Sequence, residues 1–295
     1  MNLVRAPSMD LPVVQRSPGY WSGVIRRFLR DPVSVAALLV IVALILAALL
    51  APYIAPADPN KASMLQRLKP IGTPGYPLGA DELGRDMLSR LIHGARLSLL
   101  MGLTPVPIAF IIGATLGIVA GYAGGFVNTA IMRTIDIFYA FPSVLLAVAL
   151  SGALGAGLTN ALVSITLVFI PPIARVAESV TTQIRSLDYI EAARGSGAGS
   201  MMIIREHLLG NIIGPVFVYA TGLVSVSMIM ASGLSFLGLG VRPPEPEWGL
   251  MLNTLRTAIY TQPLVAALPG VMIFITSIAF NTLADGLRAA MDVKS

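Results

Sequence analysis

The stretch DPVSVAALLVIVALILAALLA at residues 31–51 decides the fold class, because it fits a helix that crosses a lipid bilayer. Asp31 and Pro32 suit the cap and first-turn positions at which helices begin. Residues 33–51 carry no charge, and at about 1.5 Å per residue they extend about 28 Å, close to the thickness of the hydrocarbon core. A cleaved signal peptide has a markedly shorter apolar core, so this segment is expected to remain as a membrane anchor.

Further apolar segments follow along the chain. They lie at residues 97–120, 134–155, 158–174, 212–233 and 263–284. Hydrophobic residues make up 55% of the chain and charged residues 12%, which is about half of the roughly 25% found in soluble domains. The expected fold is therefore an all-α membrane protein with six transmembrane helices. Prolines inside these segments predict bent helices, because neighbouring groups in a membrane protein can satisfy the backbone that proline leaves unpaired.

Six spans place both termini on the same side of the membrane. Arg26, Arg27 and Arg30 lie just before the first span, and basic residues concentrate on the cytoplasmic side. Both termini are therefore expected in the cytoplasm. The expected organisation is a cytoplasmic tail at 1–30, a permease-like membrane domain at 31–292 with outer loops at 54–96 and 234–262 and an inner loop at 175–210, and a short end at 293–295.

Charge and composition exclude several functions. The net charge is +5, and Lys occurs only at Lys61, Lys69 and Lys294, so the excess is mostly arginine. Such an excess on a hydrophobic chain favours anionic lipid headgroups, and we expect no nucleic-acid partner. The chain has no Cys for a thiolate metal site. None of the three lysines follows a glycine, so no Walker A loop can form, and we expect no enzymatic activity, catalytic residue, metal site or cofactor on this chain.

Asp136 is the one acid or base inside the six predicted spans. Ion-driven transporters bury carboxylates or other polar ligands at mid-membrane, so the nearly uncharged spans disfavour an ion-coupled mechanism. Asp136 is expected to pair with Arg133 on the same helix face, with a relay role as the alternative. Small hydroxylated residues at helical spacing are either a substrate path or sites of helix packing. They are Thr221, Ser225 and Ser232.

The inner loop at 175–210 predicts two short helices. Asp188 and Glu191 have the spacing of a capping box, which indicates a helix over residues 189–194. Gly195, Gly197 and Gly199 would end this helix. Ser200 is expected to cap a second short helix that ends near Leu208, so the loop would form a compact knob outside the bilayer.

At this loop the chain resembles the permeases of binding-protein-dependent ABC importers. The family's loop reads Glu-Ala-Ala, three residues, Gly, and later Leu-Pro. Glu191, Ala192, Ala193 and Gly197 match in place, and His207 fits the variant found in the peptide group. Gly210 stands where the proline is usual.

The resemblance extends from about residue 31 to residue 292. Over this range the chain is similar to the second, C-type permease of the dipeptide, oligopeptide and nickel importers. It rests on PLGADELGRDMLSR at 77–90, GYAGG at 121–125, LSFLGLGV at 234–241, EWG at 247–249 and DGLR at 285–288. Ala231 departs from the pattern, because a glutamate often stands there in the family.

The resemblance implies a type I ABC importer permease in a bacterial inner membrane. It would pair with a homologous second permease, two ATPase subunits that hold ATP and Mg²⁺, and an extracytoplasmic solute-binding protein. Dipeptides or oligopeptides are the expected substrates. The alternatives are nickel or another small solute, an ion-coupled secondary transporter, and a purely structural anchor.

The resemblance also implies roles for individual residues. The loop that couples the chain to the ATPases would contain Asp188, Glu191, Ala192, Ala193, Gly197 and His207. Glu191 suits a charged contact with a partner's Arg or Lys, or a helix cap alone. Residues 81–96 resemble an amphipathic helix, which is either a solvated cap or a docking surface for the binding protein. The docking candidates are Asp81, Glu82, Arg85, Asp86 and Trp248, and Trp248 alternatively lies in the aromatic belt.

Overall fold

The structure is a computed structural model that describes residues 20–291. Within this range it is all-helical, with isolated β-bridges at Thr73–Tyr76 and Ala80–Asp86 as its only β-pairing. In chain order the helices are α1 (Tyr20–Phe28), α2 (Pro32–Leu49), α3 (Ala51–Ile54), η1 (Met64–Gln66), α4 (Met87–Leu103), α5 (Pro105–Ala123), α6 (Gly125–Tyr139), α7 (Ser143–Leu154), α8 (Leu158–Arg185), α9 (Asp188–Gly195), α10 (Ser200–Met202), η2 (Ile203–Leu208), α11 (Leu209–Phe236), α12 (Trp248–Thr254), η3 (Arg256–Tyr260) and α13 (Pro263–Met291).

Five helical segments in the described range are long and apolar enough to cross a membrane. They are α2, α4 with α5, α8, α10 through α11, and α13. A sixth crossing results if α6 and α7 together count as one broken span. The side chain of Asp31 caps α2 as expected, since it accepts hydrogen bonds from the Val33 and Ser34 amides at 3.2 Å.

The third span, at residues 134–155, was predicted as a single helix, and this prediction is wrong. α6 and α7 meet at a bend of 87°. The break lies at Pro142, which has no amide hydrogen to donate and disfavours a helical backbone at Phe141 before it. Hydropathy carries no information about this break, because both sides of it are apolar.

Several predicted helix ends are also wrong. α8 continues from the predicted end at residue 174 to Arg185, and the helix of α11 begins at Ser200 through the π-helical η2 instead of at residue 212. The second short helix of the inner loop is therefore the first part of a long one. Polar turns continue a helix beyond the bilayer, so the end of an apolar run does not mark the end of the helix.

A glycine stripe on α5 allows α5 and α8 to pack at close range. Gly113, Gly117 and Gly121 recur at four-residue spacing on one face of α5. A Cβ at Gly113 would lie 2.9 Å from the Ile170 carbonyl oxygen, and one at Gly117 would overlap with the Ala174 carbonyl oxygen. Small residues at this spacing bring membrane helices into direct backbone contact.

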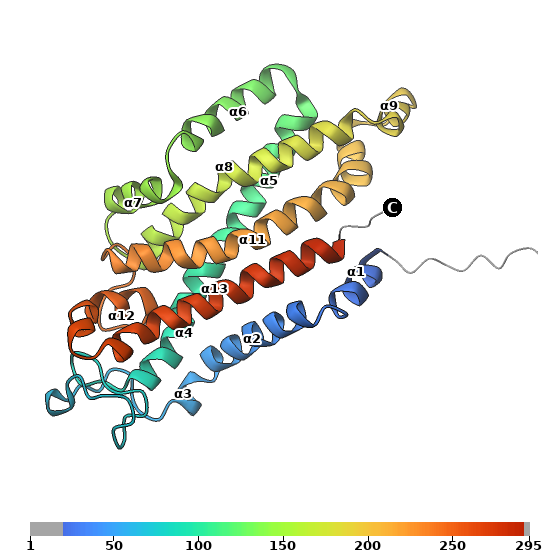
Figure 1. The fold of residues 1–295 in the computed structure, drawn as a ribbon. Helices are drawn as coiled ribbons and strands as arrows, with labels where there is room; N and C mark the ends of the chain where they lie inside the picture. The colour runs from blue at the N-terminus through green and yellow to red at the C-terminus, as the bar shows by residue number, and fades with distance from the viewer. Residues whose placement is uncertain (1–19, 292–295) are drawn as a thin grey trace, which may run out of the picture.

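The two ends of the helical bundle differ in content (Figure 1). One end holds α1, α9 and the last turn of α13, and the other holds α3, α12 and the long connection between α3 and α4. α1 forms inside the predicted tail at 1–30, and its Val24 and Phe28 pack against Ala290 of α13. The remainder of that tail before residue 20 lies outside the described residues, as does the predicted end at 293–295.

Candidate functional site

The α9 helix projects from one end of the bundle (Figure 1). Glu191 and Ala192 are exposed on it and Ala193 is half-buried, so these side chains remain accessible to a partner. Ile190 is fully buried and anchors the helix, together with Ile203 and Leu208 of η2. Most of α9 is thus exposed, and the buried apolar side chain of Ile190 holds it against the bundle.

Gly197 closes α9 through a Schellman motif. Its φ of +87° is left-handed, which suits the helix end predicted at these glycines. The Gly197 amide donates to the Arg194 carbonyl at 3.0 Å, and the Ala198 amide donates to the Ala193 carbonyl at 3.1 Å, which is the paired pattern that ends a helix at a left-handed residue. Gly199 has an ordinary φ of −69°, so only one of the three glycines meets a conformational need at this turn.

The predicted side-chain caps of the two short helices are wrong. Leu187 occupies the cap position of α9, so Asp188 is already the first helical residue. Gly199 likewise takes the cap position before Ser200. Neither helix start has a side-chain cap hydrogen bond, and Asp188 contributes instead as an acidic residue in the first turn, where the helix dipole favours negative charge.

Contacts connect α9 to three of the long helices. Tyr189 lies edge-on to His207 with ring centroids 6.3 Å apart, and the Asn211 amide donates to the Tyr189 hydroxyl at 3.4 Å. The guanidinium of Arg194 lies 5.8 Å from the ring centroid of Tyr122, at the end of α5. Arg185 of α8 donates to the carbonyls of Gly121 and Tyr122 at 3.1 and 3.0 Å. α9 thus contacts α5 and α11 through its own side chains, and Arg185 joins α8 to the end of α5 beside it.

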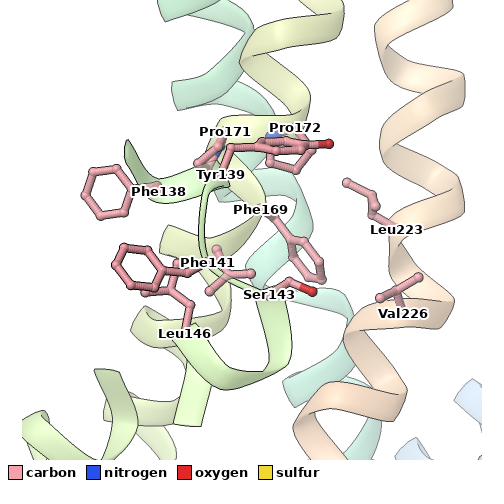
Figure 2. A pocket seen from close by; sticks show the side chains of 11 residues that line it. Phe138, Tyr139, Phe141, Ser143, Leu146, Phe169, Pro171, Pro172, Leu223 and Val226 are labelled. Atoms are coloured by element: carbon pink, nitrogen blue, oxygen red, sulfur yellow. The ribbon is translucent and has the colours of Figure 1, made fainter. Parts of the chain in front are cut away.

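A second feature is an aromatic pocket at the break between α6 and α7 (Figure 2). Its volume is about 260 Å³. Tyr139, Phe141 and Phe169 contribute to its walls, together with the Pro171–Pro172 pair of α8. Leu223 and Val226 of α11 close the far side, and the Tyr139 hydroxyl points toward α11 (Figure 2).

An ion pair lies beside this pocket. Asp136 of α6 accepts a hydrogen bond from the Arg175 guanidinium of α8, while the predicted partner Arg133 is 3.8 Å away and 80% exposed. The prediction for Asp136 therefore named a minor partner. The Arg175 guanidinium also lies 4.7 Å from the ring centroid of Tyr139, which lines the pocket.

The hydroxyl residues predicted for a substrate path lie on α11. Ser225 and Ser232 are buried and Thr221 is half-buried. Thr221 donates to the Val218 carbonyl at 2.8 Å and Ser225 to the Gly222 carbonyl at 3.0 Å, so these hydroxyls bond to their own helix. Their contact with substrate stays a prediction.

Three of the four docking candidates before α4 are buried and Glu82 is half-buried, so the structure favours the alternative of a cap with internal ion pairs over a docking surface. Asp81, Arg85 and Asp86 are 2%, 5% and 3% exposed. They lie in a turn before α4 and not on an amphipathic helix. Asp81 joins Arg85 at 2.6 Å and Arg90 at 3.2 Å, while the half-buried Glu82 joins Arg85 at 3.0 Å. The alternating charges thus form an internal polar network, because the loop folds back over the start of α4.

Trp248 is fully buried, which excludes both the docking and the aromatic-belt interpretations. Its indole donates to the Leu91 carbonyl at 3.0 Å, and its ring packs over Gly94. The adjacent Glu247 caps α12 by accepting from the Gly249 and Leu250 amides at 2.9 and 2.8 Å. Burial raises the pKa of the Glu247 carboxyl above its ordinary value.

Four titratable side chains line a larger pocket of about 780 Å³ at this end. Its lining includes His93, Arg96, Arg242 and Glu245. Arg96 donates to the Leu49 carbonyl at 2.9 Å, and Arg242 donates to the Ala156 carbonyl at 2.7 Å. His93 and Arg96 lie within the predicted surface at 81–96, whereas Arg242 and Glu245 were not singled out from the sequence, since the pocket joins α4 to three separate connections of the chain.

Arg175 and Tyr139 were also missed. The signal was partly present, because Asp136 stood out as an isolated charge and Arg175 directly follows the predicted end of its span. The erroneous helix end placed Arg175 in the inner loop and not in the fourth span, so it was not considered as a partner of Asp136.

Two family models match the chain. The description "Binding-protein-dependent transport system inner membrane component" covers residues 113–294. The description "N-terminal TM domain of oligopeptide transport permease C" covers residues 19–70.

Curated relatives align over nearly their whole length. The glutathione transport system permease protein GsiD of Pectobacterium atrosepticum is 41% identical over 98% of this chain and 97% of its own. The di/tripeptide transport system permease protein DppC of Pseudomonas aeruginosa is 40% identical over 98% of this chain and 96% of its own.

Solved structures show the same fold at lower identity. A chain of the MetNI methionine ABC transporter in an inward-facing conformation has a TM-score of 0.57 and 21% identity, over 69% of this chain and 97% of that chain. A chain of an amino acid ABC transporter has a TM-score of 0.51 and 14% identity, over 66% of this chain and 91% of that chain.

Proposed function

The chain belongs to the family of binding-protein-dependent transport system inner membrane components, as a C-type permease of the dipeptide and oligopeptide group, and from this premise we propose that it forms half of the translocation path of an ATP-driven peptide importer. It is a multi-pass protein of a bacterial inner membrane. A homologous second permease completes the path, and the substrates are dipeptides or oligopeptides. The names of the two relatives, which transport glutathione and di- or tripeptides, support this substrate class.

The proposed topology has six crossings, with α6 and α7 forming one broken crossing. Both termini and α9 face the cytoplasm. The common end of α1, α9 and α13 in Figure 1 supports this arrangement, as do the arginines of α1. The regions at 54–86 and 237–262 then face outward.

The observation that carries the proposal is the α9 surface. It presents Glu191 and Ala192 at the tip of the bundle, it is closed by a Schellman motif, and it is tied to α5, α8 and α11. Two separate ATPase subunits hold the ATP and Mg²⁺, and one of them binds this surface. Their closure displaces α9, and its contacts turn that displacement into a rigid-body motion of the long helices.

The solute-binding protein is proposed to contact the opposite end. Exposed charges there include Arg242 and Glu245 at the outer pocket, whereas the network around Asp81 is buried. Such rim charges set the rate and orientation of docking more than its affinity.

Glu191→Lys tests the coupling surface. The substitution keeps a helix-compatible residue on an exposed position but reverses the charge offered to a cationic partner. In reconstituted complexes, peptide uptake and peptide-stimulated ATP hydrolysis should both fall, and ATPase subunits should dissociate at lower salt.

The matched control is Asp58→Lys, the same reversal at an exposed acid of the opposite end. It should leave ATPase binding intact. Wild-type coupling in the Glu191→Lys complex would show that α9 is not the transmission element.

A further inference from the structure

The Asp136–Arg175 pair is an accessible charge pair inside the membrane domain. Arg175 lies about 26 Å along α8 from its first residue and about 15 Å from its last, so it is not at a helix end. The side chains of Asp136 and Arg175 are 41% and 47% exposed in the single chain. Both charged groups are therefore within reach of a polar ligand in the single chain.

The pair adjoins the aromatic pocket on a continuous surface. Asp136 precedes the pocket residue Tyr139 by three positions, and Arg175 follows Pro172 by three, so each charge shares a helix face with the pocket wall. The Arg175 guanidinium lies over the Tyr139 ring at 4.7 Å. One cation, one anion and an apolar cavity thus meet at the break between α6 and α7.

The geometry points to a subsite for zwitterionic peptides on this surface. A free peptide has an ammonium at one end and a carboxylate at the other. Arg175 would bind the carboxylate through its planar fork of donors, and Asp136 would accept the ammonium. The pocket of about 260 Å³ has room for an apolar side chain of the same peptide. This assignment rests on the proposed function and names the residues by which the path would recognise peptide ends.

The resting ion pair explains why such a subsite does not obstruct the path. Without peptide, Asp136 and Arg175 satisfy each other, and with peptide each exchanges one ionic partner for another. Because the Asp136–Arg175 pair must break before the two peptide ends can bind, the lost pair offsets part of the binding free energy and the peptide is released more easily. A path that passes substrate needs weak binding of this kind.

The test uses the complete permease and ATPase complex in nanodiscs, without the binding protein, so that only the path can select ligands. Binding of alanyl-alanine, its C-terminal amide and its N-acetyl form is measured by saturation-transfer NMR. The wild-type complex should bind the free dipeptide about tenfold or more tightly than either blocked form, as expected for the loss of a charged hydrogen bond.

The variants assign each end of the peptide to one residue. Arg175→Gln should lose discrimination against the amide and keep discrimination against the N-acetyl form, while Asp136→Asn should do the reverse. Arg256→Gln is the matched control, since Arg256 is an exposed arginine on η3 with no part in the subsite, and it should behave as wild type. The double variant Asp136→Asn with Arg175→Gln leaves no unpaired charge, and it should assemble normally and lose both preferences.

Three outcomes would overturn the subsite. The first is that the wild-type complex binds no dipeptide, and the second is that both single variants keep the wild-type discrimination between the ligands. The third outcome is that both single variants lose binding of all three ligands to the same extent. The third outcome would indicate that the ion pair holds α6 against α8 and does not bind peptide. The proposed function is tested separately. If the wild-type complex takes up peptide in an ATP-dependent way, the proposed function holds even when the subsite is refuted. If it does not, the proposed function is refuted as well.

Discussion

At the scale of single residues, Gly197 is the position where the backbone itself dictates the amino acid. Its φ is +87°, and a Cβ placed there would meet no atom within 4 Å. The cost of a side chain at this position is therefore one of conformation and not of space. The left-handed region disfavours L-residues by about 1–2 kcal/mol, and β-branched residues fit it worst.

Gly197→Val should consequently distort the end of α9 without disturbing the bundle. Peptide-stimulated ATP hydrolysis and uptake by reconstituted complexes should fall together, while the amount of chain in the membrane stays near the wild-type level. Immunoblots of membranes and paired ATPase and uptake assays would measure these quantities.

Gly199→Val is the matched control for this variant. Gly199 has a φ of −69° and also has no atom within 4 Å of a built Cβ, so valine there introduces bulk without the left-handed strain. Equal loss of coupling in both variants would refute the conformational explanation. Gly249 does not serve as a distant control, because a Cβ at this position would overlap with the Ser232 backbone.

At the scale of elements, the seam between α5 and α8 depends on the glycine stripe. A Cβ at Gly121 would lie 2.7 Å from the Thr181 Cβ, and one at Gly117 would overlap with the Ala174 carbonyl oxygen. Neither helix backbone can move aside easily, since both helices contact other long helices as well.

Gly117→Val should therefore force α5 and α8 apart and destabilise the chain by about 1–3 kcal/mol, the usual cost of overpacking. Thermal unfolding of the full chain in detergent should show a lower Tm. Gly152→Val, at an exposed glycine of α7 with no atom within 4 Å of a built Cβ, is the matched control. Equal Tm values for the two variants would contradict a close seam.

The sequence predicts these elements unevenly. The apolar run at 33–51 and the caps at Asp31 and Pro32 predict α2 within two residues of its observed end, because a long uncharged run in lipid has one stable form. The end of α9 at its glycines was predicted for a similar reason, since glycine at a helix end has a local cause. The break at Pro142 was missed, because prolines inside membrane helices often bend them without breaking them.

The candidate sites show the same limit. The exposed position of Glu191 follows from local sequence, so it was predicted correctly. The burial of Asp81, Arg85 and Trp248 depends on a loop that folds back over α4. No short-range sequence pattern predicts such a contact. The Asp136–Arg175 pair joins residues 39 positions apart, and it became visible only when α6 and α8 were placed side by side.

At the scale of the whole molecule, the common end of α1, α9 and α13 fixes the proposed orientation. The chain has no native cysteine, so single engineered cysteines report position without interference. A cysteine at Gly199 should react with an impermeant reagent only after cells are permeabilised, whereas one at Gln66 should react in intact, wall-stripped cells. The opposite pattern would invert the topology.

The central claim is that this chain passes peptides through a path opened by ATP hydrolysis on other subunits. The most direct measurement is peptide uptake by proteoliposomes that contain both permeases, the two ATPases and the binding protein, with ionophores present to dissipate every ion gradient. The account predicts uptake that requires ATP, is unaffected by the ionophores, and disappears when the ATPases or this chain are omitted. Uptake that proceeds without ATP and stops when the ionophores are added would contradict the account and identify an ion-coupled transporter.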